Sequence, residues 1–258
     1  MKNSRNRLVF AACALLEGLV VACCMGQQPE LHDVDLSKWD CARIELLHSS
    51  GAKNRPWIDL TNTNVPQWDY ETFIAETRKY DEVLAGIPVA RTEERTRALR
   101  SFENQTVSLT GWVNLASPSW PEPQNCMDRY LVDWHVEVSP RPLNHPLGIG
   151  DLTPIVCEIT PFTEGALYRA GVRMLRLAAY TASYQPTGSK PHRVRVSGYL
   201  FCDDSHGGSN YVGRVVTHME FNGRRPERAT AWEIHPIVRI EDLGTQLRDT
   251  GHTPNGKP

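Results

Sequence analysis

Beyond residue 22, the sequence has no apolar run approaching the roughly 18 residues that a membrane-spanning helix needs. It has no Cys-x-x-Cys pair, which argues against the common zinc-binding motifs. It also lacks a nucleophile elbow and a glycine-rich loop that opens a helix to cradle a phosphate. The formal net charge is only −2, so the basic excess of a dedicated nucleic-acid binder is missing. These absences narrow the functional classes without selecting one.

The long apolar run that is present lies at the N-terminus, where Leu8 to Ala22 follows a positive leader. Its length predicts the hydrophobic region of a signal peptide over residues 1–22, because it is too short to span a bilayer comfortably. The segment ends Val20-Val21-Ala22-Cys23, which resembles the lipobox of bacterial lipoproteins. The resemblance implies cleavage after Ala22, lipidation of Cys23, and an exported protein anchored to a membrane by acyl chains. Ordinary secretion with cleavage near Gly26 is the alternative.

Export makes disulfides chemically feasible, and the chain has seven cysteines. If Cys23 carries lipid, Cys24 lies beside the membrane. Four cysteines then remain in the body of the protein, and their spacing leaves the pairing open: Cys41, Cys126, Cys157 and Cys202.

Residues 23–105 are predicted to form a linker and a partly helical accessory region. Residues 29–65 are polar and interrupted by Pro56, which indicates irregular structure. Asp69 to Leu84 and Thr92 to Phe102 are the two predicted helices. Thr92 can cap the second helix, whose early acidic residues suit its positive N-terminal end.

After residue 105 the apolar residues recur at every second position, which predicts β-strands. The predicted strands span Val107–Val113, Tyr130–Val138, Ile155–Thr160, His192–Cys202 and Thr230–Ile240. Between the third and fourth strands, residues 165–181 carry an apolar helical stripe and predict one helix, which Thr163 can cap. This order predicts a mainly β fold, a five-stranded OB-like barrel over residues 106–243. A β-sandwich with a stray helix is the alternative, and residues 244–258 are expected to form a disordered tail.

Two of these strands repeat an acid-x-histidine pattern on the face opposite the apolar one. In an OB barrel the second strand neighbours the third, and the third neighbours the fifth. At about 4.8 Å between strands, the polar residues of all three would share a patch roughly 10 Å across. The predicted patch comprises Asp133, His135, Glu158, Glu233 and His235, with His206 in a neighbouring loop at its edge.

Imidazole and carboxylate groups in this arrangement favour a divalent metal site or an acid–base site. A metal there would lower the pKa of a bound water and so support hydrolysis. The alternative is a polar outer face without chemistry, because alternation predicts such a face in any barrel. Its acids and histidines would then pair with Arg193, Arg195 and Arg239, or with the N-terminal segment.

Three tryptophans lie on the predicted strands. Trp134 and Trp232 fall on apolar faces, which predicts that both belong to the core. Trp112 falls on a polar face and is the candidate for stacking a nucleobase or a sugar.

The last two strands have a distinctive pattern. Val194-Arg195-Val196-Ser197-Gly198-Tyr199-Leu200 precedes Asp203 and His206, and is followed by Arg228-Ala229-Thr230-Ala231-Trp232-Glu233-Ile234-His235-Pro236. This resembles uncharacterised exported bacterial proteins with an OB-like domain that ends in an Arg-x-Thr-x-Trp-Glu-Ile-His-Pro strand. The resemblance covers residues 107–240; it implies an exported domain and transfers no reaction.

The sequence therefore predicts a lipid-anchored, non-catalytic binding or interaction module of the cell envelope. Its partner, besides the membrane, is an unidentified protein or small molecule, and the charge argues against nucleic acid. The first alternative is a metal-dependent hydrolase, for example of phosphodiesters, that uses His135, His235 and neighbouring carboxylates. Single-stranded nucleic-acid binding is the second.

Overall fold

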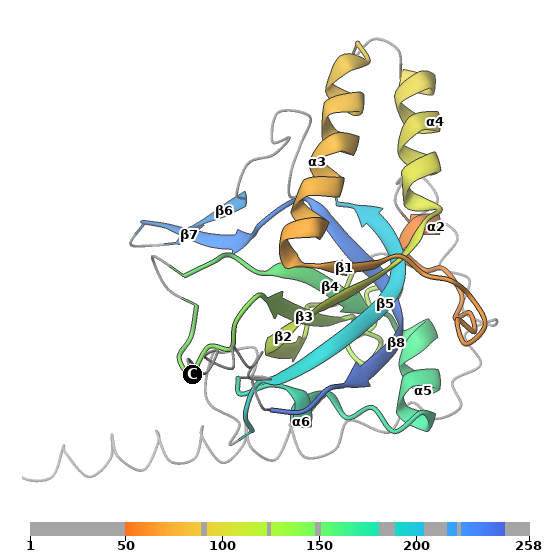
Figure 1. Ribbon diagram of the computed structural model, residues 1–258. Helices are drawn as coiled ribbons and strands as arrows, with labels where there is room; N and C mark the ends of the chain where they lie inside the picture. Colours follow the sequence, from red (N-terminus) through yellow and green to blue (C-terminus); the bar gives the residue numbers. More distant parts are fainter. Residues whose placement is uncertain are drawn as a thin grey trace, which may run out of the picture. The chain divides into compact units, whose positions relative to one another are not determined.

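The structure is a computed structural model that describes residues 50–88, 92–122, 125–147, 151–180, 189–203, 216–220 and 223–245 (Figure 1). All of these residues belong to one compact unit, Leu36–Pro258. The predicted signal segment, the lipidation site Cys23, the loop residue His206 and most of the predicted tail lie outside them.

Five strands close into a barrel. They are β2 (Thr106–Pro118), β3 (Trp134–Ser139), β4 (Ile155–Ile159), β5 (His192–Cys202) and β8 (Trp232–Asp242). Their order is β2-β3-β4-β8-β5, and β5 pairs again with β2 to close the barrel. The β4–β8 pair is parallel and the others are antiparallel. This is the predicted five-stranded OB-like barrel, in which the third strand lies beside the fifth; the prediction is confirmed.

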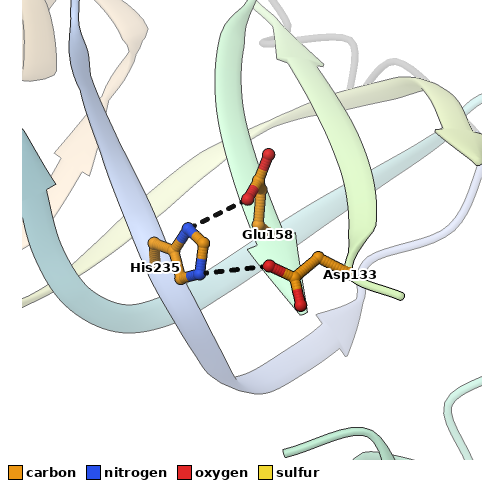
Figure 2. A group of neighbouring side chains, drawn as sticks. All are labelled: Asp133, Glu158 and His235. Atoms are coloured by element: carbon orange, nitrogen blue, oxygen red, sulfur yellow. Dashed lines mark ion pairs between the residues drawn. The ribbon is translucent and has the colours of Figure 1, made fainter. Parts of the chain in front are cut away.

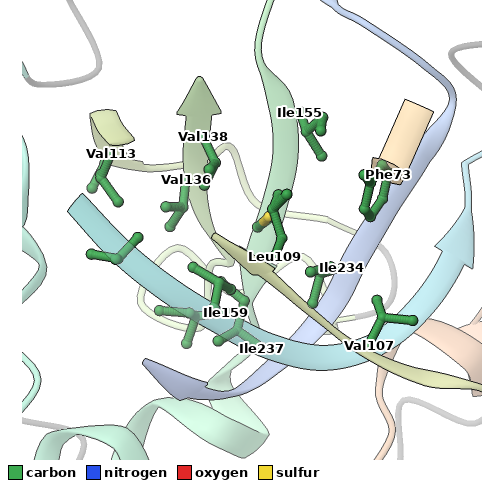
Figure 3. Close-up of a cluster of buried hydrophobic side chains, with 14 of the residues drawn as sticks. Phe73, Val107, Leu109, Val113, Val136, Val138, Ile155, Ile159, Ile234 and Ile237 are labelled. Atoms are coloured by element: carbon green, nitrogen blue, oxygen red, sulfur yellow. The ribbon is translucent and has the colours of Figure 1, made fainter. Parts of the chain in front are cut away.

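The interior of the barrel is filled by the apolar residues of the alternating pattern (Figure 3). Trp134 and Trp232 belong to this core, as predicted. Branched aliphatic side chains suit a pleated, buried surface and supply most of the remaining contacts. Those labelled in Figure 3 on the five strands are Val107, Leu109, Val113, Val136, Val138, Ile155, Ile159, Ile234 and Ile237.

The β5–β8 pairing is irregular around Gly198, where the register shifts. A Cβ atom at Gly198 would lie 2.3 Å from the carbonyl oxygen of Pro236, so only glycine allows this close approach. Strict alternation along the predicted last strand would place Ile234 and Val238 on the same face, and the irregularity changes this. Val238 does not share the inner face with Ile234; it packs outside with Leu60 and Val65, while Ile237 turns inward.

A helix between the third and fourth barrel strands is confirmed, but it does not run over the predicted residues 165–181. The chain instead forms α5 (Pro161–Arg169) and α6 (Met174–Leu177). Gly171, at φ +90°, ends α5: its N–H donates to Tyr168 O and the Val172 N–H donates to Leu167 O. This is a Schellman motif, for which glycine is the favoured residue. Thr163 does not cap α5 either, because Thr160 holds that position.

The described part of the accessory region contains α2 (Ser50–Lys53), β1 (Gln67–Asp69), α3 (Tyr70–Gly86) and α4 (Thr92–Glu103). Both predicted helices are confirmed to within about two residues at each end. Asp69 caps α3 by accepting a hydrogen bond from the Thr72 N–H at 2.8 Å. Helices α3 and α4 lie side by side (Figure 1).

The accessory region shares the core of the barrel. Strand β1 pairs in parallel with β2, and Phe73 of α3 is fully buried among the inward residues of the strands (Figure 3). The Trp232 indole N–H donates to Asp81 of α3 at 2.7 Å. The region therefore folds as part of the same body as the barrel.

A short hairpin, β6 (Val216–Glu220) and β7 (Gly223–Arg228), lies between β5 and β8 in the sequence and was not predicted. It forms a separate two-stranded sheet. Within the described ranges, no helix has both the length and the apolar character needed to cross a membrane.

Candidate functional site

Three polar side chains converge on the outer side of the barrel: Asp133 from the residue before β3, Glu158 from β4 and His235 from β8 (Figure 2). The His235 ring lies between the two carboxylates. Its Nδ1 is 3.0 Å from Glu158 Oε2, and its Nε2 is 3.6 Å from Asp133 Oδ2. The β4–β8 pairing of Cys157 with Ile234 places these neighbouring residues side by side. The three residues are called the acid–histidine cluster below.

The other two predicted residues of the patch adjoin this cluster. His135 Nδ1 lies 3.6 Å from Glu158 Oε1, and its Nε2 lies 3.6 Å from Glu137 Oε1. Glu233 Oε1 is 3.7 Å from His235 Nδ1. The predicted juxtaposition of five residues from three strands is thus confirmed. What the patch binds stays a prediction.

The cluster lies on the polar outer face that alternation predicts, and it is buried there. Asp133 is 1% exposed, Glu158 6%, and His235 and Glu233 are fully buried. Alternation along the strands separates the two faces correctly, but it does not show what covers the outer face. Burial changes the chemistry, because a charged group removed from water needs compensating partners.

Part of the cover is the N-terminal strap, defined here as residues 50–66. The Lys53 amine lies 5.8 Å from the centre of the Phe201 ring, which in turn lies 5.4 Å from the His235 ring. Further along, the Arg55 guanidinium lies over Tyr199, and Trp57 donates its indole N–H to the Val238 carbonyl at 2.9 Å. The strap therefore runs over the outer side of β5 and β8.

The loop between β2 and β3 supplies two further contacts. Asn125 is 3% exposed and donates through Nδ2 to Asp133 Oδ1 at 2.8 Å. Glu122 lies 3.4 Å from the Lys53 amine, which joins the loop to the strap. Both segments have a polar group directed at the cluster.

Arg228, at the end of β7, connects the cluster to a further acid. Its Nη1 lies 3.3 Å from Glu233 Oε2 and 3.6 Å from Asp203 Oδ2, and all three side chains are buried. Lys53 and Arg228 are permanent cations beside the cluster, and His135 and His235 lie against the same group of acids. The carboxylates gathered here are Glu122, Asp133, Glu137, Glu158, Asp203 and Glu233.

The ionisation of the cluster follows from this crowding. Burial raises the pKa of Asp133 to about 7, against the opposing effect of His235. Burial alone would lower the pKa of His235, but Glu158, Glu233 and Asp133 raise it to about 10. Burial likewise opposes the charge on Glu158, yet His235 and His135 hold its pKa well below the usual value.

Lys53 shows the same balance. Burial alone would lower its pKa, but Glu158, Glu233, Glu122 and Asp203 together raise it. Lys53 thus remains positively charged beneath the protein surface and supplies part of the charge that the acids require.

Several polar atoms of the cluster have no hydrogen-bond partner although they are buried. They are Asp133 Oδ2, Glu158 Oε2, Glu233 Oε1 and both ring nitrogens of His235. These atoms face one another as ion pairs at 3.0 to 3.7 Å. Buried polar atoms without a hydrogen bond are rare in proteins and need a physical reason, such as charge pairing or a bound ion. One ligand atom from each of Asp133, Glu158 and His235 can be chosen so that all lie within 4.8 Å of one another, a spacing suited to a metal ion.

Sequence reasoning missed several residues of this site, namely Lys53, Glu122 and Asn125. They lie at the end of a four-residue helix and in a loop, where no periodicity marks them. Arg228 was noticed only as part of the resemblance pattern. Its position just before the Trp-Glu-Ile-His strand was the one available signal.

Other predicted residues are placed differently from expectation. Trp112 is 3% exposed, so it offers no open face for stacking a base or a sugar. Arg195 and Arg239 pair with Glu241, at 2.7 Å and 2.6 Å, and not with the cluster. His206 lies outside the described residues, and its predicted place at the edge of the patch stays a prediction.

The cysteines are partly assigned. Cys126, in the loop beside Asn125, is disulfide-bonded. Cys157 and Cys202 are not disulfide-bonded, and Cys157 is buried in the barrel core.

Comparison of the chain with known protein families, with curated proteins and with solved structures finds no match in any of the three.

Proposed function

We propose that this protein is an exported, lipid-anchored OB-fold module of the cell envelope that binds a partner without catalysing a reaction. One observation carries the proposal. OB barrels commonly bind ligands on the face of their second and third strands, which here are β3 and β4. That face holds the acid–histidine cluster, whose three side chains are at most 6% exposed beside the strap and the β2–β3 loop, and this burial argues against a substrate reaching them.

Export and anchoring are supported by the N-terminal sequence and by one feature of the fold. The apolar run ending in Ala22-Cys23 has the order of a lipoprotein signal. The disulfide at Cys126 suits an oxidising compartment outside the cytosol.

The anchor is tested by fractionation. The Cys23→Ala variant is expected to leave the membrane fraction and appear in the soluble exported fraction, because its acyl chains are lost. Cys24→Ala is the matched control and is expected to stay with the membrane. Retention of Cys23→Ala in the membrane would refute the anchor.

A metal-dependent hydrolase is the second candidate, favoured by the convergence of Asp133, Glu158 and His235. Such an enzyme needs an open coordination position for water and substrate. Our proposal predicts that the wild-type protein, supplied with Zn²⁺ or Mn²⁺, hydrolyses a bis(p-nitrophenyl) phosphate probe no faster than His235→Ala. A metal-dependent rate that disappears in His235→Ala would show that the protein is a hydrolase and not a non-catalytic module.

A single-stranded nucleic acid is a poor ligand for this face, since carboxylates lie beneath it and Trp112 is buried and offers no stacking surface. The partner is therefore proposed to be a protein or a small molecule. No binding of a fluorescent oligonucleotide at low salt is the expected result; tight, salt-sensitive binding would contradict it.

A further inference from the structure

We propose that the acid–histidine cluster is a binding site for one divalent metal ion, with Asp133, Glu158 and His235 as its protein ligands. One imidazole and two carboxylates suit zinc or manganese best among the common divalent ions. The site goes beyond the proposed binding function, because a buried ion can hold the fold together without any reaction.

The two carboxylates are oriented in the way that metal ligands usually are. Asp133 Oδ1 accepts the hydrogen bond of Asn125, while Asp133 Oδ2 has no hydrogen-bond partner. Glu158 Oε1 faces His135, while Glu158 Oε2 has no hydrogen-bond partner. In each carboxylate, one oxygen contacts a neighbouring side chain and the second oxygen points toward His235 (Figure 2). Outer partners of this kind fix the direction of the inner ligands in metal sites.

The spacing of the ligand atoms is compatible with an ion between them. Ligands at about 2.1 Å from a tetrahedral zinc ion are separated from one another by about 3.4 Å. The contacts of His235 with Glu158 Oε2 and Asp133 Oδ2, at 3.0 and 3.6 Å, involve different ring nitrogens, and only one of these nitrogens can bind a given ion. One ligand atom from each of the three residues lies within 4.8 Å of the other two, so they can surround a single ion. Glu233 Oε1, also buried and without a hydrogen bond, is a further donor nearby.

A cation at the centre would face the two carboxylate oxygens that have no hydrogen-bond partner, Asp133 Oδ2 and Glu158 Oε2. An ion bound through one nitrogen of His235 releases any proton that this nitrogen carries. The charge of the ion then takes the place of the imidazolium charge between the two carboxylates.

The ligands also come from separate strands. Asp133 precedes β3, while Glu158 is in β4 and His235 is in β8. The β4–β8 contact is the parallel pair, for which a single Cα pairing is resolved, Cys157 with Ile234. A metal ion would therefore cross-link the barrel where its backbone pairing is shortest.

The proposal is tested with the full mature chain, treated with a chelator and then titrated with ZnCl₂ or MnCl₂ by calorimetry. We expect one equivalent to bind and to remain after dialysis. Asp133→Asn and His235→Gln are each expected to weaken binding at least tenfold. The matched controls are Asp242→Asn and His192→Gln, which alter an aspartate–histidine pair at 2.8 Å on the surface and are expected to leave binding unchanged.

A second measurement uses the wild-type protein alone, so its result does not depend on whether the variants fold. Wild-type protein loaded with Co²⁺ is expected to show visible absorption that reports nitrogen and oxygen ligands, and its melting temperature is expected to rise with metal concentration. If the chelated wild-type protein binds no stoichiometric metal, or if the surface controls weaken binding as much as the cluster variants, the site is refuted. Either failure leaves the anchoring experiment with Cys23→Ala unaffected.

Discussion

The two faces of strands β3, β4 and β8 are both buried, but by different means. The inner face is apolar and packs against the rest of the barrel and against Phe73 of α3. The outer face carries Asp133, Glu158 and His235 and is covered by the strap and the β2–β3 loop. The inner face needs only the hydrophobic effect to be buried, whereas the outer face is buried at an electrostatic cost.

This difference indicates where the stability and the specific chemistry of the molecule reside. Apolar side chains of similar volume can replace one another in a core with modest loss. In a buried set of carboxylates, histidines and basic residues a single exchange is more costly, because removing one partner leaves the others without compensation. The inner face therefore specifies the barrel, and the outer face is the part of this fold with a candidate function.

The largest effect is expected on the inner face. Trp232→Ala removes a fully buried indole that also donates to Asp81, and should lower the free energy of unfolding by about 4 kcal/mol. Trp120→Ala, at a residue 87% exposed, is the control and should change it by less than about 0.5 kcal/mol. Equilibrium denaturation in urea measures both. Equal effects of the two substitutions would contradict the assignment of Trp232 to the core.

A somewhat smaller loss is expected on the outer face. Arg228→Met leaves Glu233 and Asp203 buried without this cation, and should cost about 3 kcal/mol. Arg195→Met is the same substitution at a partly exposed ion pair with Glu241 and should cost less than about 1 kcal/mol. If the two variants unfold at the same denaturant concentration, the charges of the outer face are not buried as described.

The smallest effect lies outside both faces. Asp69→Ala removes the cap of α3 and should cost about 1 kcal/mol at neutral pH. Hydrogen bonds from Thr72 hold the pKa of Asp69 below its usual 3.8, so the stabilisation is present above that value and is lost as the pH falls through the lower, folded-state pKa. Stability curves of wild type and variant should therefore converge in acid. A gap that persists unchanged below pH 3 would rule out this role.

Much of the barrel could be predicted because its strands obey a simple rule. Apolar residues at every second position, as in Val194, Val196 and Leu200, mark one buried face, and five such segments with one intervening helical region define the OB-like order. The convergence of the acid–histidine residues followed from that order alone. Local alternation and strand adjacency together were sufficient to place side chains that lie a hundred residues apart.

The remaining features depend on contacts that no periodic pattern encodes. The pairing of β8 with β5 shifts register beside Gly198, and Val238 therefore lies on the outer side of the barrel. Helix α5 ends just before Gly171. The apolar stripe in the sequence does not reveal the left-handed conformation of this glycine. Burial of the cluster depends on Lys53 and Asn125, which reach it from segments of irregular sequence.

The most direct test of the account is a crystal structure of the zinc-treated protein with anomalous diffraction recorded on both sides of the zinc absorption edge. We predict one strong anomalous peak beneath the strap, within bonding distance of Asp133, Glu158 and His235. A zinc-treated crystal with no peak among these three side chains, or with the three exposed on an open surface, would contradict it.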